Sequence, residues 1–315
     1  MLTTLQLRQA AALSGARDIS AIEVDIGLTC LLQLFHEKGL TDHLAFKGGT
    51  FLRKMVFGPK GRLSTDLDFT CRTDISLDDL TMGLLEALAQ PYHGLTFRFD
   101  KNRDWYLTDD GCAANPVLAH PGNPTGVKIK IQVSTRERPI RPVHAVPQVQ
   151  QSYFKHLAFA PAAILSLALE EVIAEKIRAA SQRSKIRDLY DLSEIARRPL
   201  AKELIRSLAV LKLWNSGGPG LDFNRFRARI ESGSDYDIMD LKNLLRKDQS
   251  PDLTTMIARV VDNFQFLGHL TEIECTLAND WLRTSWPPRL RRTKLWQASV
   301  SAQISTSTAR RTRRR

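Results

Sequence analysis

The chain has 315 residues, 43% of them hydrophobic and 25% charged, which is the composition of a globular protein with room for one large domain or two. Its formal net charge is +11, but nine basic residues and no acid fall in 287–315. The rest of the chain therefore carries only +2, so the basic excess belongs to the tail and not to the body of the protein. No apolar run approaches the roughly 18 residues that span a bilayer, no signal peptide is visible, and the four cysteines form no CxxC pair, so we expect a cytoplasmic protein without a membrane segment or a zinc site.

The N-terminal half has the alternating helix and strand signals of a mixed α/β layer. Apolar residues at helical spacing mark the first long segment as a core helix. Ser76 followed three residues later by Asp79 is a variant of the capping box that starts a helix. In chain order, the expected elements are a helix over 19–40, a strand over 43–46, the first turns of a helix over 51–57, a strand over 67–72, a helix over 76–90 and two short extended runs within 94–107.

The next segment, Val127–Ser134, alternates strictly between apolar and polar residues and is predicted to be one half-buried strand. Its apolar side chains point inward, while Lys128, Lys130, Gln132 and Ser134 lie on the other face. Three prolines within 139–147 then mark a boundary, and the pattern from 163 to about 282 is helical.

These elements predict an α+β fold with a mixed-sheet core followed by a helical C-terminal half. We expect a core domain over 1–147, a helical domain over 148–286 and a disordered basic tail over 287–315. The tail either attracts RNA without sequence preference or has no binding role.

Two aspartates in the second strand, Asp66 and Asp68, are the first candidates for chemistry. Residues i and i+2 of a strand face the same way, so both carboxylates share one face while Leu67 and Phe69 face the core. Like charges held side by side repel, and a divalent cation removes the conflict. Mg²⁺ takes one or two carboxylates together with substrate phosphates, so the pair predicts a Mg²⁺ site that Mn²⁺ would also suit; a solvated strand end is the alternative.

A turn of Gly48, Gly49 and Thr50 precedes this strand. Glycines allow a ligand to approach the backbone closely, and the free N–H groups at the start of the following helix suit phosphate. Thr50 adds a hydroxyl donor. The turn is not a Walker A loop, and on its own it would be read as a tight bend. Next to paired aspartates, it predicts a phosphate cradle beside a metal site.

Two blocks of the sequence resemble a known family. KGGTFLRKMVFG…RLSTDLDF is similar to the signature of the AbiEii/AbiGii toxins, a branch of the polymerase-β-like nucleotidyltransferases that includes the MenT-like toxins. Gly49-Thr50 matches the family's glycine-Ser/Thr turn, and Asp66/Asp68 match its Asp-x-Asp strand. The second block is EEVIAEKIRAASQRSKIRDLYDL, over 170–192. It is similar to the EK…R…RDLYDL segment that follows the first block in the family. The resemblance covers about residues 20–270.

The resemblance implies roles for two further residues. Lys176 would contact the phosphates of the nucleotide, and Asp188 would be an essential acid of the active site. Without the first block, Asp188 and its charged neighbours would be read as a surface ion-pair cluster. One departure from the wider superfamily stands out: the strand Val127–Ser134 carries no third carboxylate, so either Asp188 takes its place or the metal has fewer protein ligands.

The function that these residues and the resemblance imply is transfer of a nucleoside monophosphate from an NTP to an acceptor hydroxyl. By resemblance, the protein is the toxin of an abortive-infection type toxin–antitoxin system in phage defence, with the tRNA 3′ end as acceptor and a cognate antitoxin as partner. Nucleotide transfer to a protein, kinase-like phosphoryl transfer and a non-catalytic module that binds nucleic acid or a partner remain alternatives.

Overall fold

The computed structural model describes residues 3–100, 102–108, 111–233 and 236–280. The predicted basic tail, 287–315, lies outside these ranges. The described chain forms two compact units. Within the described ranges, the first unit comprises residues up to 139, 143–167 and 237–252, and the second comprises 140–142, 168–233, 236 and 253–280.

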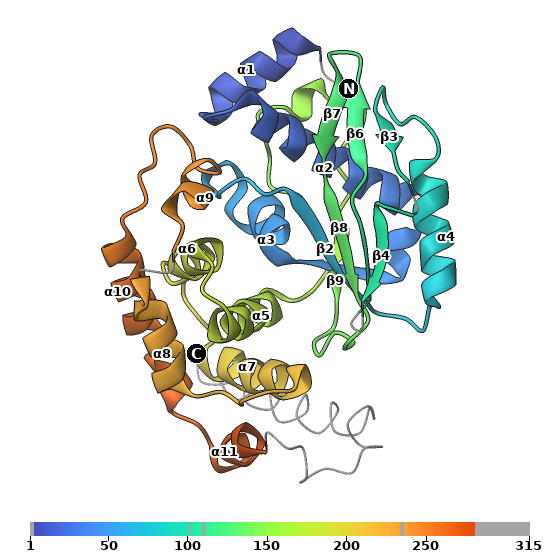
Figure 1. Ribbon diagram of the computed structural model, residues 1–315. Helices are drawn as coiled ribbons and strands as arrows, with labels where there is room; N and C mark the ends of the chain where they lie inside the picture. Colours follow the sequence, from blue (N-terminus) through green and yellow to red (C-terminus); the bar gives the residue numbers. More distant parts are fainter. Residues whose placement is uncertain (1–2, 101, 109–110, 234–235, 281–315) are drawn as a thin grey trace, which may run out of the picture. The chain divides into compact units, whose positions relative to one another are not determined.

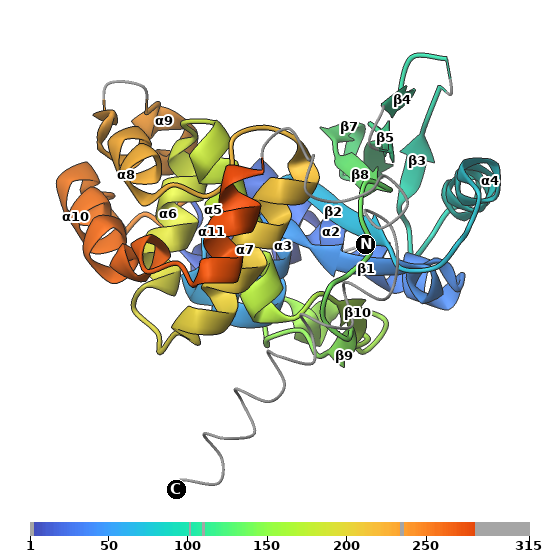
Figure 2. The ribbon, with the colours of Figure 1, turned by 90° about the horizontal axis from the view of Figure 1, so that it is seen from below.

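The first unit is built on a seven-stranded mixed sheet in the order β4-β5-β8-β2-β1-β10-β9. Strands β2 and β8 pair in parallel, as do β1 and β10, and the other neighbours are antiparallel. Figure 1 shows β2 and β8 side by side, and Figure 2 shows β1, β10 and β9 in succession. The strands are β1 (Leu44–Lys47), β2 (Asp66–Cys71), β4 (Trp105–Thr108), β5 (Gly111–Ala114), β8 (Lys130–Ser134), β9 (His144–Val146) and β10 (Ile164–Ser166).

A second, three-stranded sheet has the order β3-β6-β7. Its strands are β3 (Thr96–Arg98), β6 (Val117–His120) and β7 (Asn123–Lys128). The predicted single strand Val127–Ser134 is therefore wrong: the chain leaves β7 at Lys128 and joins the larger sheet at Lys130. Ile129 lies between the two strands and is buried, so an unbroken alternating pattern hides a change of sheet.

Helices complete the first unit, and the longest forms part of its core. Phe35 of α2 packs against Phe69 of β2 with ring centroids 6.1 Å apart. Ser76 caps α4 as predicted, accepting a hydrogen bond from the Asp79 backbone N–H at 3.0 Å. The helices are α1 (Thr4–Ser14), α2 (Ile19–Glu37), α3 (Gly48–Phe51), α4 (Leu77–Leu88) and α9 (Ile238–Lys242), with short helical turns η1 (Leu40–Asp42), η2 (Leu52–Phe57), η3 (Gly58–Lys60) and η4 (Phe154–His156).

Helix α2 corrects one expectation from the sequence. Its 19 residues, with a mean hydropathy of 1.4, are long and apolar enough to cross a membrane, so the statement that no segment reaches this length is wrong. In the structure, 78% of the most apolar 18-residue stretch of this helix is buried inside the protein. That is the environment of a core helix, because a helix surrounded by lipid would keep its apolar side chains on the outside.

The second unit is helical, as expected for this part of the chain. Helix α5 packs against α6 and α7, α10 packs against α6 and α8, and α11 packs against α7. Figure 2 shows α5, α6 and α7 next to one another. The helices are α5 (Leu169–Gln182), α6 (Ile186–Ile195), α7 (Lys202–Ser216), α8 (Phe223–Glu231), α10 (Leu253–Asn263) and α11 (Glu272–Asn279), with a helical turn η6 (Gln265–Gly268).

The division into units does not follow the expected boundary at residue 147. Strands β9 and β10 lie beyond it, and β10 pairs directly with β1, so the sheet is incomplete without residues 143–167. Residues 237–252 also belong to the first unit, where the backbone N–H of Leu63 donates to the carbonyl of Leu244 at 2.8 Å.

Candidate active site

The turn at the end of β1 brings the backbone against the first candidate acid. Gly48 has a φ of +83°, which only glycine adopts without strain. A Cβ built on Gly48 would overlap Oδ2 of Asp68 and lie 2.9 Å from its Cγ. The antiparallel pairing of β1 with β2 places Lys47 directly opposite Asp68 and so sets this approach. The missing side chain of Gly48 therefore gives the Asp68 carboxylate its place beside the turn.

The second acid, Asp66, is tied to the same turn. The hydroxyl of Thr50, which is fully buried, donates to the main-chain carbonyl of Asp66. The hydroxyl of Ser64 donates to Oδ1 of Asp66 at 3.0 Å, and the backbone N–H of Thr65 donates to the same oxygen at 3.3 Å. In the structure, the hydroxyl of Thr50 thus holds the turn onto β2.

The strand geometry agrees with the face assignment made from the sequence. Asp66 and Asp68 are partly exposed, whereas Leu67 and Phe69 are buried. The turn at 48–50 and the acidic pair are therefore neighbours on one side of the sheet, as the sequence predicts. Figure 1 shows α3, which begins at the turn, next to β2.

The neighbouring strand β8 supplies no third acid to this face. Its parallel register puts Lys130 beside Asp66 and Gln132 beside Asp68. Within the described ranges, no group of three or more His, Cys, Asp or Glu side chains is placed to hold a metal ion. Two carboxylates that share a partly exposed face still fit Mg²⁺, which commonly takes one or two protein carboxylates and completes its shell with phosphates and water.

The candidates of the second unit form a buried ion cluster of their own. Nζ of Lys176 on α5 lies 2.9 Å from Oδ1 of Asp188 and 2.8 Å from Oδ2 of Asp191, both on α6. Nε of Arg183 lies 2.9 Å from Oδ2 of Asp188. Asp188 and Asp191 are only 2% and 1% exposed, so the reading of this cluster as surface ion pairs is wrong.

Charge in this cluster controls the ionisation of Asp188. Burial alone would raise its pKa, but the charges of Lys176 and Arg183 outweigh burial and hold the pKa well below the usual 3.8. Buried ion pairs contribute little net stability because desolvation opposes the attraction. A buried lysine between two carboxylates is therefore a candidate for a functional role.

Comparison with known proteins identifies the family. The sequence profile described as "Nucleotidyl transferase AbiEii toxin, Type IV TA system" matches residues 30–278. The chain belongs to the AbiEii nucleotidyltransferase toxin family. As a member, it is a transferase and the toxin of a type IV toxin–antitoxin system, and the family implies a cognate antitoxin partner.

Two solved structures are similar to this AbiEii-family chain. It is similar to MenT4, a nucleotidyltransferase toxin from Mycobacterium tuberculosis H37Rv, with a TM-score of 0.73 and 27% identity over 88% of this chain and 94% of that one. It also matches JHP933 from Helicobacter pylori, with a TM-score of 0.45 and 20% identity over 79% of this chain and 95% of that one. A search of curated protein sequences found no match. The mixed sheet with its helices and the match to MenT4 show the α+β nucleotidyltransferase toxin fold.

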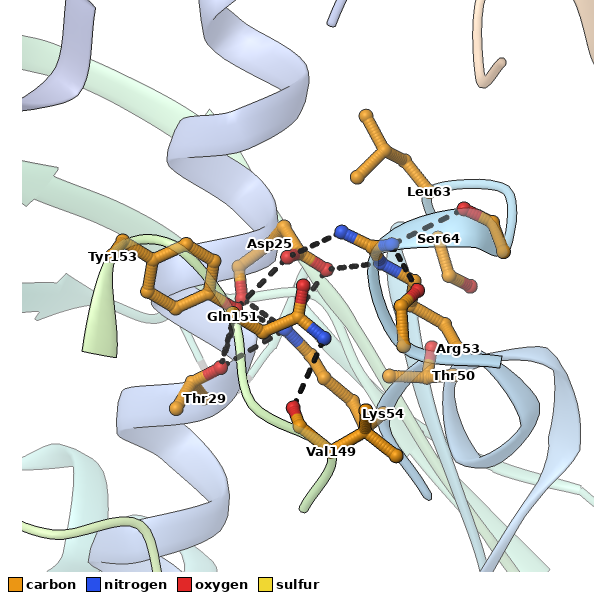
Figure 3. Close-up of polar contacts among 12 residues, drawn as sticks. Asp25, Thr29, Thr50, Arg53, Lys54, Leu63, Ser64, Val149, Gln151 and Tyr153 are labelled. Atoms are coloured by element: carbon orange, nitrogen blue, oxygen red, sulfur yellow. Dashed lines mark hydrogen bonds and ion pairs between the residues drawn. The ribbon is translucent and has the colours of Figure 1, made fainter. Parts of the chain in front are cut away.

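Sequence reasoning missed a buried ion cluster beside the turn of this AbiEii-family protein (Figure 3). Asp25 on α2 lies 2.8 Å from Nζ of Lys54 and 3.4 Å from Nη2 of Arg53, both on η2. The hydroxyl of Tyr153 donates to Oδ2 of Asp25 at 2.9 Å, and Lys54 donates to the hydroxyl of Thr29 at 2.9 Å. We call these five residues the Asp25 cluster.

Burial and charge shift the titration of this cluster. Burial would raise the pKa of Asp25, but Lys54 and Arg53 outweigh it and keep that pKa far below its usual value. Burial lowers the pKa of Lys54 to about 8, against the attraction of Asp25. The signal in the sequence was two acids, Glu23 and Asp25, inside the apolar stretch AIEVDIGL and two adjacent cations inside FLRKMVF. Opposite charges in the predicted core helix and in the helical turns predicted over 51–57 must pair if both segments are buried.

Proposed function

We propose that this AbiEii-family toxin transfers a nucleoside monophosphate from an NTP to an acceptor hydroxyl. The observation that carries the proposal is the contact of the Asp68 carboxylate with the Gly48 backbone, which joins a phosphate-sized turn to an acidic pair on one strand face. The acceptor oxygen forms a bond to the α-phosphorus, the bond to the bridging oxygen breaks, and pyrophosphate and the hydroxyl proton leave.

Different residues of the chain would bind the metal ion and the phosphates. Asp66 and Asp68 would hold Mg²⁺, or Mn²⁺, which when bound neutralises charge on the triphosphate. The backbone of Gly48, Gly49 and Thr50 binds and orients the phosphates. The hydrogen bonds that hold Asp66 from Ser64 and Thr65 fix its carboxylate before substrate arrives, which is the preorganisation that electrostatic catalysis needs.

We also propose that Lys176 and Asp188 take part in the reaction, as the resemblance to the family implies. Lys176 carries a positive charge that suits the pyrophosphate leaving group, and its contacts to Asp188 and Asp191 hold that charge in a defined position. Asp188 stays ionised at neutral pH because its pKa is lowered, so it orients Lys176 or the acceptor and is not an acid that delivers a proton.

The acceptor that we propose is the 3′ end of tRNA. The test incubates the purified protein with Mg²⁺, total tRNA and each of the four NTPs labelled in the α-phosphate. Label retained on RNA supports the proposal. Label on protein would show nucleotide transfer to a side chain, and movement of γ-label alone would show a kinase-like reaction. Absence of all three would contradict the proposal and leave the non-catalytic binding module as the alternative.

A further inference from the structure

A buried arginine lies against the other glycine of the turn. Arg62, in the segment between η3 and β2, is only 5% exposed. A Cβ built on Gly49 would overlap its Nη2 and lie 3.3 Å from its Cζ. Its Nη1 donates to the carbonyl of Leu63 at 3.1 Å. The two glycines are therefore bracketed by opposite charges, with the carboxylate of Asp68 against Gly48 and the guanidinium of Arg62 against Gly49.

The Asp25 cluster holds the segment that carries Arg62. Nη1 of Arg53 donates to the carbonyl of Gly58 and, at 3.2 Å, to the carbonyl of Gly61. Arg53 is in turn fixed by Asp25 through its Nε and Nη2 atoms. In Figure 3, Arg53 lies between Asp25 and the loop segment that contains Leu63 and Ser64. A continuous chain of contacts thus runs from α2 through Arg53 to the residue next to Arg62.

We infer that Arg62 is a further nucleotide-binding residue, whose guanidinium donates to the phosphate oxygens of a nucleoside triphosphate bound at the Gly48–Thr50 turn. This inference rests on the proposed function. A guanidinium presents a planar set of donors that matches phosphate, and it keeps its charge at any physiological pH. Arg53 and Asp25 are positioning residues, because they act through the segment that carries Arg62.

The chemistry of the turn favours this assignment over a purely structural role. A triphosphate bears several negative charges, and the two aspartates beside Gly48 repel it unless a metal ion and a cation balance them. Gly49 has no side chain to separate the guanidinium from the backbone of the turn. Phosphate oxygens held by that backbone would therefore lie within reach of Arg62.

The test compares Arg62→Gln and Arg62→Lys with the wild type in NTP-dependent labelling. A hydrogen bond to a charged group is worth roughly 1.5–3 kcal/mol, so we expect Arg62→Gln to raise the KM for NTP about 10- to 100-fold, with a smaller change in kcat. Arg62→Lys should recover part of this loss, because lysine keeps the positive charge but lacks the planar set of donors of the guanidinium. The matched control is Arg206→Gln, which removes another buried arginine, one bonded to Glu274 at 2.8 Å, and should leave the KM unchanged.

Gly49→Ala provides a second test that keeps Arg62 itself. The three atoms nearest to the added methyl group are all at the far end of the flexible Arg62 side chain, so the protein should fold and the guanidinium should move. We expect Gly49→Ala to raise the KM for NTP, and the double variant Gly49→Ala/Arg62→Gln to be no worse than Arg62→Gln alone, because both changes remove the same contact.

The outcomes separate the inference from the function on which it rests. If the wild type transfers label and the KM values of Arg62→Gln and Arg62→Lys equal that of the wild type, the inference is wrong and the proposed function stands. If the wild type neither binds NTP nor transfers label, the proposed function fails and the inference fails with it. Should Arg62→Gln not fold, Arg62→Lys and Gly49→Ala decide by the same KM comparison.

Discussion

The first unit contains two groups of charged side chains that have opposite surroundings. In the Asp25 cluster, one acid and two cations are withdrawn from water, and the ion pairs and hydrogen bonds among them compensate the buried charge. On β2, the like charges of Asp66 and Asp68 share a partly exposed face, and hydroxyl and backbone groups hold Asp66 in place. The first arrangement keeps its charges paired inside the unit, and the second presents charge to a ligand.

The largest loss of activity is expected for Asp66→Ala, which removes one of the two partly exposed charges on β2. Loss of one of the two carboxylates proposed to hold the metal should lower NMP transfer by about 10³-fold or more, because Asp68 alone would then hold the ion. Thermal unfolding should change little, since Asp66 is partly exposed. Asp78→Ala, which removes an exposed aspartate of α4, is the control and should keep its activity. Full activity in Asp66→Ala would contradict the assignment.

The Asp25 cluster should respond in the opposite way. Asp25→Asn leaves Arg53 and Lys54 buried without their counter-charge, and we expect a loss of about 3–5 kcal/mol in the free energy of unfolding, measured with urea. The matched control is Asp18→Asn, because Asp18 caps the same helix and asparagine caps a helix equally well. Equal stability of Asp25→Asn and wild type would show that the two buried cations do not need the charge of Asp25.

The stability of the first unit should also depend on pH through Asp25. The pKa of Asp25 is lower in the folded protein than its usual 3.8, so its contribution is fully present above that value. As the pH falls below about 3.8, the unfolded state takes up a proton first, and stability is lost towards the folded pKa. The free energy of unfolding should therefore fall more steeply in this acid range for the wild type than for Asp25→Asn.

The smallest effect is expected at a residue that belongs to neither group. Ser76→Ala removes the side-chain acceptor at the start of α4 and should cost about 1 kcal/mol of stability without changing NMP transfer. Ser76→Asp should restore the cap. A large loss of activity in Ser76→Ala would mean that α4 contributes to the site.

The sequence was sufficient for the parts that depend on local pattern. The spacing of Asp66 and Asp68 fixed their common face, and two glycines beside them indicated a backbone that must come close to another group. What could not be predicted depends on contacts between distant segments. The charges of Asp25 and Arg53 meet only after α2 and η2 pack together.

Two further features were hidden for local reasons. The stretch Phe51–Phe57 reads as an ordinary helix, yet its residues from Leu52 are π-helical, and helical hydrogen bonding starts earlier, at Gly48. The alternation of Val127–Ser134 persists across the change of sheet at Ile129, because the pattern records which side chains are buried and not which sheet buries them.

We propose that the turn at Gly48–Thr50 and the acids Asp66 and Asp68 form one metal–nucleotide site. Its most direct test is a crystal structure of the protein with Mn²⁺ and an NTP analogue that resists cleavage, using the anomalous signal of manganese. We expect manganese between the two carboxylates and triphosphate oxygens on the backbone of the turn. Manganese and nucleotide bound elsewhere, with Asp66 and Asp68 free of metal, would contradict it.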